Sequence, residues 1–397
     1  MFYLILAVST IVFVRGITTL FFLLRSLSWL KAANTESLKS IIEDKPQVHI
    51  LIPALREQKR IIDTIKYFQK HILIEDNVDL IIVTTQREFE KKFSGLSTNQ
   101  LVKNFIAENN CSNISIIDSP HQTGIKAHQL NYALDQIDDD SFITVYDADS
   151  RPHPRTFEAF YSELAKNPKA KVFQQSAVFF NNFKSLKSSF LRSSAILQSR
   201  WTLAHELPRL FRQSFGEGKF IKKYAYAHVV GHGLFIDINV LKSVGGFPAQ
   251  TITEDLFLGY LLRASGHSIY PLPLLESSDA PTTVKSLWGQ KYVWFFGPLK
   301  MITYLKYVLK NTRKLKVFDL SVPWIMTVQG MISATAWLVS GPFIFLLLAS
   351  PLLTQNITMV LFAWLAVFTY GPLQFFITLI YYQKLLAYAG TVSPNPK

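Results

Sequence analysis

Short apolar runs alternate with amphipathic stretches in the first half of the chain. The runs are rich in β-branched residues and lie at residues 48–53, 79–83, 113–117 and 141–146. Between the last two runs, residues 125–137 carry apolar side chains at helical spacing, namely Leu130, Ala133, Leu134 and Ile137. Strands that are apolar throughout are typical of a sheet buried on both faces. The alternation predicts an α/β fold with a parallel, doubly wound sheet that binds ligands beyond the carboxyl ends of its strands.

The pattern after residue 153 is mixed. Residues 172–178 and 229–236 are predicted as strands, and residues 183–210 as one or two helices. After a glycine turn at 245–248, Thr253 is predicted to cap a helix that begins with Glu254 and Asp255. Carboxylates at that end of a helix are stabilised by its dipole.

Three long apolar stretches, at residues 2–24, 323–349 and 357–382, are candidates for crossing a membrane. Between Asp319 and Lys384 the only ionisable residues are tyrosines, and each stretch exceeds the roughly 20 residues that a spanning helix needs. The first has neither a basic lead segment nor a clear cleavage site, which favours an uncleaved anchor. Its Arg15 either faces protein or water, or it snorkels to the interface.

Basic residues flank these stretches and predict their orientation. Arg25 and Lys31 follow the first, and six Lys or Arg residues lie between residues 300 and 316. The positive-inside rule then predicts that the amino terminus lies outside, and that the segment between the first and second stretches and the carboxyl terminus lie in the cytoplasm. Residues 283–309 are aromatic and basic, with Trp288 and Tyr292 on one helical face, as in a helix lying in the membrane interface.

Composition narrows the list of partners. The net charge is +13, but much of the basic excess lies beside the apolar stretches, so anionic lipid headgroups are favoured over nucleic acid. Cys111 is the only cysteine. It excludes an internal disulfide and fits a reducing compartment.

Two acidic clusters carry the candidate chemistry. Asp147 and Asp149 follow the run at 141–146, so they lie at the ligand-binding edge of the sheet, where two hard oxygen ligands suit Mg²⁺ or Mn²⁺. The alternative is an acidic turn that ends a strand. Glu254 and Asp255 open the later helix, and there the alternative is an ordinary capped helix start.

Five short motifs occur in a fixed order between residues 47 and 300. They are IPALRE (52–57), GIKA (124–127), DAD (147–149), GHG (231–233) with GGF (245–247), and TED (253–255). This ordered set resembles the membrane-integrated family 2 glycosyltransferases, which include cellulose, chitin, hyaluronan and poly-N-acetylglucosamine synthases. The resemblance implies an A-type glycosyltransferase fold with a mixed, mostly parallel sheet, three transmembrane helices and an interfacial amphipathic helix.

The resemblance also implies roles for particular residues. Asp149, with Asp147, would hold Mg²⁺ or Mn²⁺ against the donor diphosphate, and Asp255, beside Glu254, would be the general base of an inverting transfer. The implied donor-binding residues are Pro53, Glu57, Lys126 and Asp147. The implied acceptor-binding residues are Gly231, His232, Gly233, Gln290 and Trp294.

Two positions depart from the family pattern. The second strand lacks the usual terminal aspartate, so Glu88 serves from a shifted position or the nucleotide base is recognised differently. The processive motif Q-x-x-R-W is present as Gln290 to Trp294 with Val293 in place of arginine, and Val293 cannot hydrogen-bond. A similar string, Gln198 to Trp201, has the wrong spacing and position and is assigned no role.

We therefore expect a membrane-bound inverting glycosyltransferase of cell-surface glycan synthesis, acting at the cytoplasmic face of the cell membrane. It would move a sugar from a nucleotide-diphospho-sugar to a lipid-linked or polysaccharide acceptor. The alternatives are a processive polysaccharide synthase and exporter, a metal-dependent phosphatase or nucleotidyltransferase, and a membrane transporter. A membrane homo-oligomer or an export partner stays open, and no nucleic-acid partner is expected.

The expected organisation has six parts. They are a transmembrane helix (1–25), a cytoplasmic glycosyltransferase domain (46–282), interfacial amphipathic helices (283–316), two transmembrane helices (322–350 and 357–383) and a cytoplasmic tail (384–397).

Overall fold

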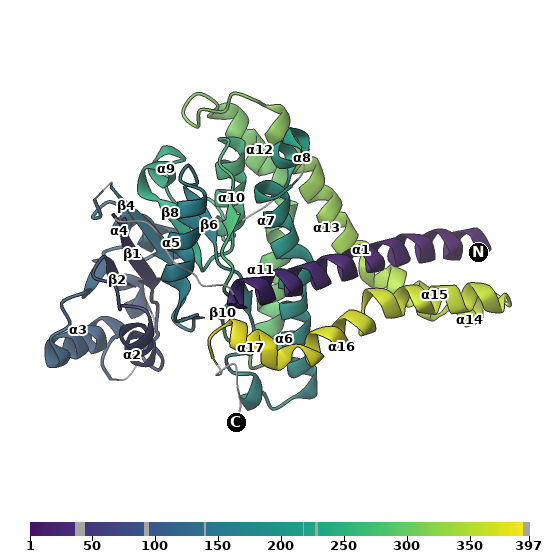
Figure 1. Cartoon of the computed structure of the whole chain (residues 1–397), viewed down its shortest axis with the longest axis horizontal. Coiled ribbons are helices and arrows are strands. Elements are labelled where there is room, and N and C mark those ends of the chain that lie inside the picture. Colours follow the sequence, from purple (N-terminus) through teal and green to yellow (C-terminus); the bar gives the residue numbers. More distant parts are fainter. Residues whose placement is uncertain (36–43, 91–94, 139, 217, 227–228, 392–397) are drawn as a thin grey trace.

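A seven-stranded sheet forms the centre of an α/β body, from which a helical arm projects (Figure 1). The computed structural model describes residues 1–35, 44–90, 95–138, 140–216, 218–226 and 229–391. The last six residues of the expected cytoplasmic tail, 392–397, lie outside the described residues.

The strand order of the central sheet is β3-β2-β1-β4-β8-β6-β9. The four strands predicted from the apolar runs are present as β1 (Gln47–Pro53), β2 (Val78–Thr85), β3 (Ile114–Ser119) and β4 (Ser141–Val145). They pair in parallel, whereas β8 (Leu234–Asp237) runs antiparallel to β4 and to β6 (Val172–Gln174). With β9 (Tyr270–Pro271) parallel to β6, the sheet is mixed and mostly parallel, as expected.

Two of the predicted strands are shorter in the structure than the sequence indicates. Residues 172–178 split between β6 in the central sheet and β7 (Ala177–Val178) in a small sheet with β5 (Arg151–Pro152) and β10 (Glu276–Ser277). Residues 229–236 become a strand only from Leu234, because Gly233 has a φ of +66° and turns the chain. The backbone N–H of Gln175 donates to the Gly233 carbonyl (2.7 Å). This hydrogen bond joins the point where residues 172–178 divide to the turn at Gly233.

Helices cover the sheet and carry the chain between its strands. The predicted helix at 125–137 is α4 (Lys126–Leu134) and the one at Glu254 is α10 (Glu254–Ala264). The others on the body are α2 (Ile61–His71), α3 (Thr98–Asn109), α5 (Thr156–Lys166), α8 (Lys219–Tyr224) and α9 (Ile238–Ser243). The segment predicted as one or two helices is α6 (Ser189–Trp201) and α7 (Leu207–Ser214), joined by a π-helical turn at Thr202–Glu206.

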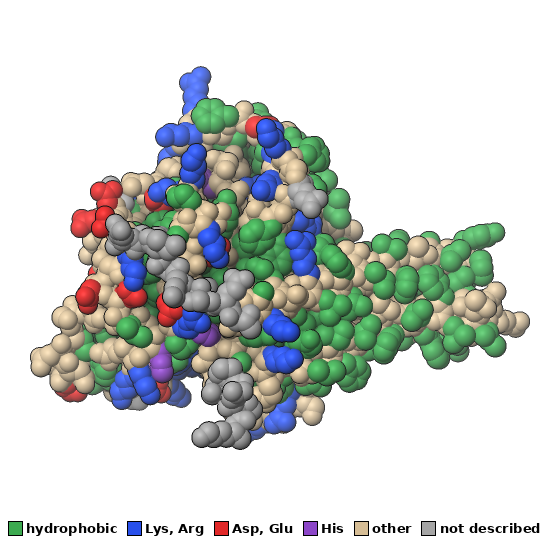
Figure 2. Space-filling view, viewed as in Figure 1, with side chains coloured by type: hydrophobic (Ala, Val, Ile, Leu, Met, Phe, Trp, Pro, Cys, Tyr) green, Lys and Arg blue, Asp and Glu red, His purple; other side chains and the backbone are tan. Residues whose placement is uncertain are grey.

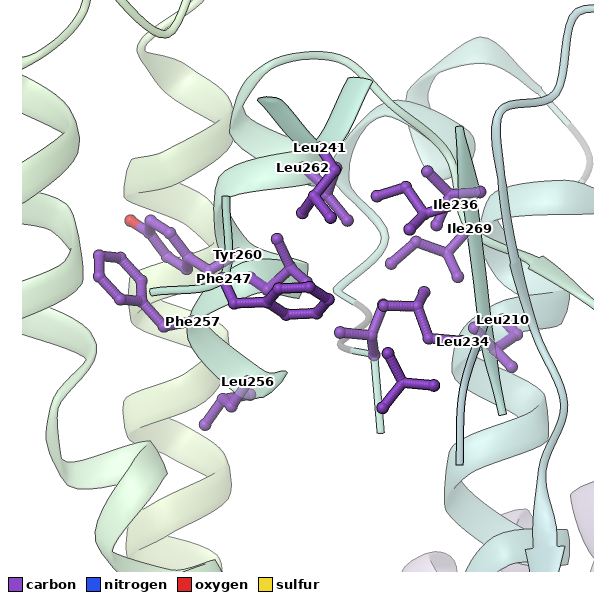
Figure 3. Packing of buried hydrophobic residues seen from close by; sticks show 14 of the residues in the cluster. Leu210, Leu234, Ile236, Leu241, Phe247, Leu256, Phe257, Tyr260, Leu262 and Ile269 are labelled. Carbon is purple, nitrogen blue, oxygen red and sulfur yellow. The ribbon is translucent and has the colours of Figure 1, made fainter. Parts of the chain in front are cut away.

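Helix α10 links the sheet to the helices near the arm. Its apolar side chains pack against β8, α7 and α9 (Figure 3). On its other side, Phe257 stacks on Tyr304 of α12 (Met301–Lys310), with ring centroids 4.3 Å apart. The Tyr260 hydroxyl donates to the Pro323 carbonyl of α13 (Ser321–Leu348) at 2.9 Å. The helix that begins with the second acidic cluster is therefore bonded directly to α13.

Among the described residues, three helical segments are long and apolar enough to span a membrane, namely Phe2–Asn34, Ser321–Leu348 and Ile357–Ile380. They correspond to α1 (Phe2–Thr35), α13 (Ser321–Leu348), and α15 (Ile357–Tyr370) followed by α16 (Pro372–Ile380). The short helices α14 (Ser350–Leu353) and α17 (Tyr382–Tyr388) flank the last segment. Figure 2 shows an arm covered with hydrophobic side chains, with Lys and Arg along its junction with the body.

Helix α1 continues well past the expected end of the first span at residue 25. Its second half enters the body, where Leu23, Leu27 and Leu30 are buried in the main core. The Ser26 hydroxyl donates to the Leu203 carbonyl at 2.7 Å. The segment expected to lie in the membrane interface forms α11 (Val284–Leu299) and α12, and Trp288 and Tyr292 of α11 are exposed.

Candidate active site

A cavity of about 300 Å³ lies where the body meets α11 and α13. Both acidic clusters reach it, through Asp147 and Asp149 after β4 and through Asp255 at the start of α10. Its far wall belongs to the membrane-candidate helix α13, at Gly330 and Trp337. We call this space the catalytic cavity.

Lys126 lies between the two acidic clusters. Its ammonium donates to Asp147 Oδ1 (2.5 Å) and to the Gly231 carbonyl (2.6 Å). Burial alone would lower the pKa of Lys126, but the charges of Asp147, Glu254 and Asp255 outweigh it and raise that pKa. Burial would likewise raise the pKa of Asp147, but Lys126 holds it below its usual range. Asp147 is therefore an anion at neutral pH.

Asp149 carries an excess of negative charge around it. Burial, and then the charges of Asp147, Asp279 and Glu276, raise its pKa to about 6. Its nearest cation is Arg60, 3.7 Å away, and Arg60 is closer to Asp279 (3.1 Å). Among the described residues no group of three His, Cys, Asp or Glu side chains could enclose a metal ion. Two carboxylates at the edge of a cavity would instead suit an open cation site, in which a bound molecule would supply the remaining oxygen ligands.

Asp255 is a buried carboxylate held by its own helix. Its Oδ1 accepts the Leu256 backbone N–H at 2.7 Å. Burial raises its pKa above the usual value, against the pull of Lys126 and His232. Burial and the charge of Asp255 raise the pKa of the neighbouring Glu254 to about 7. A desolvated carboxylate of raised pKa is a better proton acceptor than one in water.

Thr253 precedes α10, but its side chain does not cap the helix as predicted. No capping hydrogen bond is formed. Its hydroxyl instead bonds to Thr251 (3.1 Å) and to the Tyr304 hydroxyl of α12 (3.0 Å). The tertiary contact with α12 takes the place of the local one.

The GHG segment lies against Asp255 and contains a buried ion pair. A Cβ on Gly231 would lie 3.5 Å from Asp255 Oδ2, so glycine leaves the Asp255 carboxylate open to the cavity. His232 Nδ1 lies 3.1 Å from Glu276 Oε2. Burial would lower the pKa of His232, but Glu276 and then Asp147 raise it to about 9. A cationic imidazole therefore faces the acidic clusters.

Glu276 is the main residue of the site that the sequence did not indicate. It is fully buried and accepts the hydroxyls of Ser150 (2.6 Å) and Ser278 (2.7 Å) besides pairing with His232. The only signal was an acid directly after the apolar run 269–275. Its partners lie far apart in the chain, so no local motif could identify it.

The degenerate processive motif also reaches the cavity. Gln290 and Trp294 both line it. Gln198 donates to Gln290 Oε1 at 2.7 Å, and the rings of Trp201 and Trp294 lie 6.3 Å apart. The segment at residues 198–201 is thus packed against residues 290–294, whose motif it resembles.

Lys291 is poorly suited to replace the arginine that the Q-x-x-R-W motif has at the position of Val293. Its ammonium lies 3.8 Å from the centre of the Trp294 ring. Burial lowers the pKa of Lys291 to about 7, so only part of the population carries charge at neutral pH.

The other predicted catalytic, donor-binding and acceptor-binding residues do not line the catalytic cavity. Lys126 and Glu254 line a small pocket next to it, whereas Pro53, Glu57 and Gly233 are not among the described residues that line either space. Gly233 instead donates its N–H to the Val145 carbonyl (2.7 Å), which is a structural contact.

Glu88, one of the two explanations for the missing base-binding aspartate, is buried and hydrogen-bonded to neighbouring side chains. It is 1% exposed and accepts the side chain of Gln58 and both the N–H and the hydroxyl of Thr98. At the end of β3, Asp118 accepts the hydroxyl of Thr84 at 2.7 Å.

The fold is similar to that of A-type glycosyltransferases of known structure. A solved structure of the mannosyltransferase PcManGT from Pyrobaculum calidifontis, in complex with GDP-Man and Mn²⁺, aligns with a TM-score of 0.50 at 15% identity. The alignment covers 95% of this chain and 98% of that one. Glucosyl-3-phosphoglycerate synthase from Mycobacterium tuberculosis, with Mn²⁺ and uridine diphosphate, gives a TM-score of 0.39 at 12% identity, covering 73% and 82% of the two chains.

The family assignment of this chain comes from its sequence. The family model "Glycosyl transferase family group 2" matches residues 142–392, more than half of the chain. The protein belongs to this family. A probable glycosyltransferase of Bacillus subtilis (strain 168), YdaM, is 24% identical over 281 residues. The match covers 70% of this chain but 62% of that relative, less than two thirds of its length.

Proposed function

We propose that the protein transfers a glycosyl group from a nucleotide-diphospho-sugar to an acceptor hydroxyl, with inversion at the anomeric carbon. The observation that carries this proposal is the meeting of Asp147, Asp149 and Asp255 in one cavity, with the Lys126 ammonium between them. Two acidic clusters of different environment in one space suit two tasks, one for the leaving group and one for the nucleophile.

Each residue has a task in this transfer. Asp147 and Asp149 would hold a Mg²⁺ or Mn²⁺ ion, which when bound neutralises charge on the departing diphosphate. Asp255 accepts the proton of the acceptor hydroxyl, whose oxygen forms a bond to the anomeric carbon. The bond from that carbon to the β-phosphate oxygen breaks, and the nucleoside diphosphate leaves. Lys126 and protonated His232 stabilise the negative charge that collects there.

The acceptor would enter from the membrane side. The catalytic cavity is partly walled by α13, one of the three helices long and apolar enough to span a membrane. The basic residues between 300 and 316 favour a cytoplasmic body and a site at the inner face of the cell membrane. A lipid-linked or polysaccharide acceptor of cell-surface glycan synthesis fits that position.

A processive polysaccharide synthase is the second candidate. The paired rings of Trp201 and Trp294 offer an aromatic platform on which a sugar face could stack. Against it, Val293 and the partly charged Lys291 supply no guanidinium for the donor diphosphate. Product length on a gel separates the two, because a processive enzyme yields long chains without short intermediates.

The test is donor turnover by the purified full-length chain. The detergent-solubilised protein is incubated with Mn²⁺ or Mg²⁺ and a panel of nucleotide sugars, and nucleoside diphosphate release is measured with and without EDTA. We expect release from one class of donor, abolished by EDTA. If no donor is turned over under any condition, the proposal is wrong. Release of sugar phosphate in place of nucleoside diphosphate would favour the phosphatase or nucleotidyltransferase alternative.

A further inference from the structure

A second, larger cavity adjoins the catalytic one. Its volume is about 720 Å³, and it lies between α1, α7 and α13. Arg15 of α1 and Arg209 and Arg212 of α7 line it together, with His205 beside them. None of its described lining residues is acidic. We call this space the arginine cavity.

The two cavities are neighbours with a shared boundary. Arg209, Tyr226 and Ser333 line both of them. The π-helical turn Thr202–Glu206 stands between them, since Thr202 and Glu206 line the catalytic cavity while Ala204 and His205 line the arginine cavity. Single π-helical turns occur frequently at functional sites. A molecule held in the arginine cavity could therefore extend past Arg209 toward Asp255.

Two of the arginines that line the arginine cavity, Arg15 and Arg212, keep their positive charge unpaired within the described part of the chain. Neither Arg15 nor Arg212 forms an ion pair with any carboxylate of the described residues. Among those same residues, Arg15 Nε is buried without a hydrogen-bond partner, and the Arg212 guanidinium lies over the Phe22 ring at 5.2 Å. Arg200, just outside, is already bonded to Gln374 Oε1 (2.7 and 2.9 Å).

The charges of these arginines act together on His205. Burial, and then the charges of Arg200, Arg209, Arg15 and Arg212, lower the pKa of His205 well below its usual value. A neutral His205 leaves a purely cationic set of guanidinium groups around an open space. Guanidinium groups bind phosphate oxygens through paired, charge-assisted hydrogen bonds.

The cavity lies where a lipid headgroup would be found. Arg15 precedes Leu23, the first α1 residue buried in the main core of the body, by eight residues, or about 12 Å along a helix. Ile11 and Val14, which also line the cavity, are 55% and 58% exposed on the apolar surface of the arm. One wall of the cavity is thus basic and next to the body, and another is apolar and continuous with the outside of α1.

We propose that the arginine cavity binds the phosphate or diphosphate of a membrane lipid, and that this lipid is the glycosyl acceptor. The inference rests on the proposed function and narrows its acceptor to a lipid joined to its reacting end through phosphate. The acyl or prenyl chain lies along Ile11 and Val14, the phosphate lies between Arg15, Arg209 and Arg212, and the acceptor hydroxyl enters the catalytic cavity. The phosphate is held and not consumed, because the bond that forms is at the hydroxyl oxygen.

A binding experiment on the full-length protein in neutral detergent tests the site without any turnover. The probes are phosphatidic acid, diacylglycerol with the same chains, and glycerol 3-phosphate, each at increasing concentration, with retained lipid measured by native mass spectrometry. We expect phosphatidic acid to bind far more tightly than the other two, because only it offers both phosphate and chains.

Matched arginine variants locate the binding. Arg15→Gln and Arg212→Gln should each raise the Kd for phosphatidic acid by about tenfold or more, through loss of charge-assisted hydrogen bonds. Arg212→Lys should restore part of the affinity. Arg25→Gln is the control, because Arg25 lies on α1 over the Phe211 ring and outside the cavity lining, and its Kd should equal that of the wild type.

Several results would overturn the inference. They are equal binding of phosphatidic acid and diacylglycerol, equal binding of glycerol 3-phosphate and phosphatidic acid, and unchanged affinity in both Arg15→Gln and Arg212→Gln. The inference would also fail if alkyl glycosides without phosphate served as acceptors as well as phosphate-linked glycolipids, while the proposed transfer would stand. Intact lipid binding without any donor turnover would instead count against the proposed transfer alone.

Discussion

The Asp255→Asn change tests the proposed chemistry with little disturbance of the fold. Asparagine has the shape of aspartate, and its Oδ1 can keep the 2.7 Å hydrogen bond from the Leu256 N–H. The amide nitrogen then takes the position of Oδ2, which faces Gly231 and the catalytic cavity. An amide nitrogen there donates hydrogen bonds and accepts no proton.

The expected loss follows from the task removed. Proton acceptance by a positioned side chain contributes about 10²–10⁴-fold to the rate, which corresponds to about 3–5 kcal/mol of barrier. Folding should not suffer, because Asp255 is one of two adjacent carboxylates whose repulsion helps raise the pKa of Glu254 to about 7. The variant should therefore unfold at the same temperature as the wild type, or slightly above it.

The assay is nucleoside diphosphate release at saturating donor and metal, with thermal unfolding measured on the same preparation. Asp135→Asn is the matched control, since Asp135 is exposed at the end of α4, the helix that carries Lys126, and its rate should equal that of the wild type. Transfer by Asp255→Asn within about tenfold of the wild-type rate would refute the role of general base. A large fall in unfolding temperature would refute the electrostatic account of Glu254 and Asp255.

Three further predictions concern the cation, the fold and the orientation. Asp149→Asn should raise the Mn²⁺ concentration for half-maximal activity by about tenfold or more, and an unchanged metal titration would exclude Asp149 as a ligand. Gly233→Ala should lower the unfolding temperature more than Gly245→Ala. Both residues have positive φ, but only at Gly233 would a Cβ meet a backbone atom, 2.5 Å from the Gln175 carbonyl oxygen. Equal falls in unfolding temperature would contradict this reason. A reporter fused after residue 397 should be inaccessible from outside intact cells, and external labelling would reverse the proposed orientation.

Local patterns were sufficient for much of the architecture. The four parallel strands, α4, α10 and the three apolar helical segments could be predicted because burial on both faces, helical spacing and long uncharged runs each leave a signal within a short window. Asp147 and Asp149 could be placed at the ligand edge for the same reason, since the carboxyl ends of parallel strands meet there. Their roles in catalysis still await the experiments above.

Contacts between distant segments were decided only by the tertiary structure. Residues 172–178 look like one strand, yet the turn at Gly233 divides them between two sheets. Glu276 completes the site through His232 and Ser150, which lie in other parts of the chain.

Arg15 is another residue whose neighbours only the tertiary structure shows. From the sequence it was an isolated charge in an apolar stretch with two open explanations. In the folded chain it lines a cavity with Arg209 and Arg212, nearly two hundred residues later. The sequence by itself determined the elements and the chemistry available, because both are local properties. The partners of each charged group depend on how α1, α7 and α13 pack together, and no periodicity within one segment records that packing.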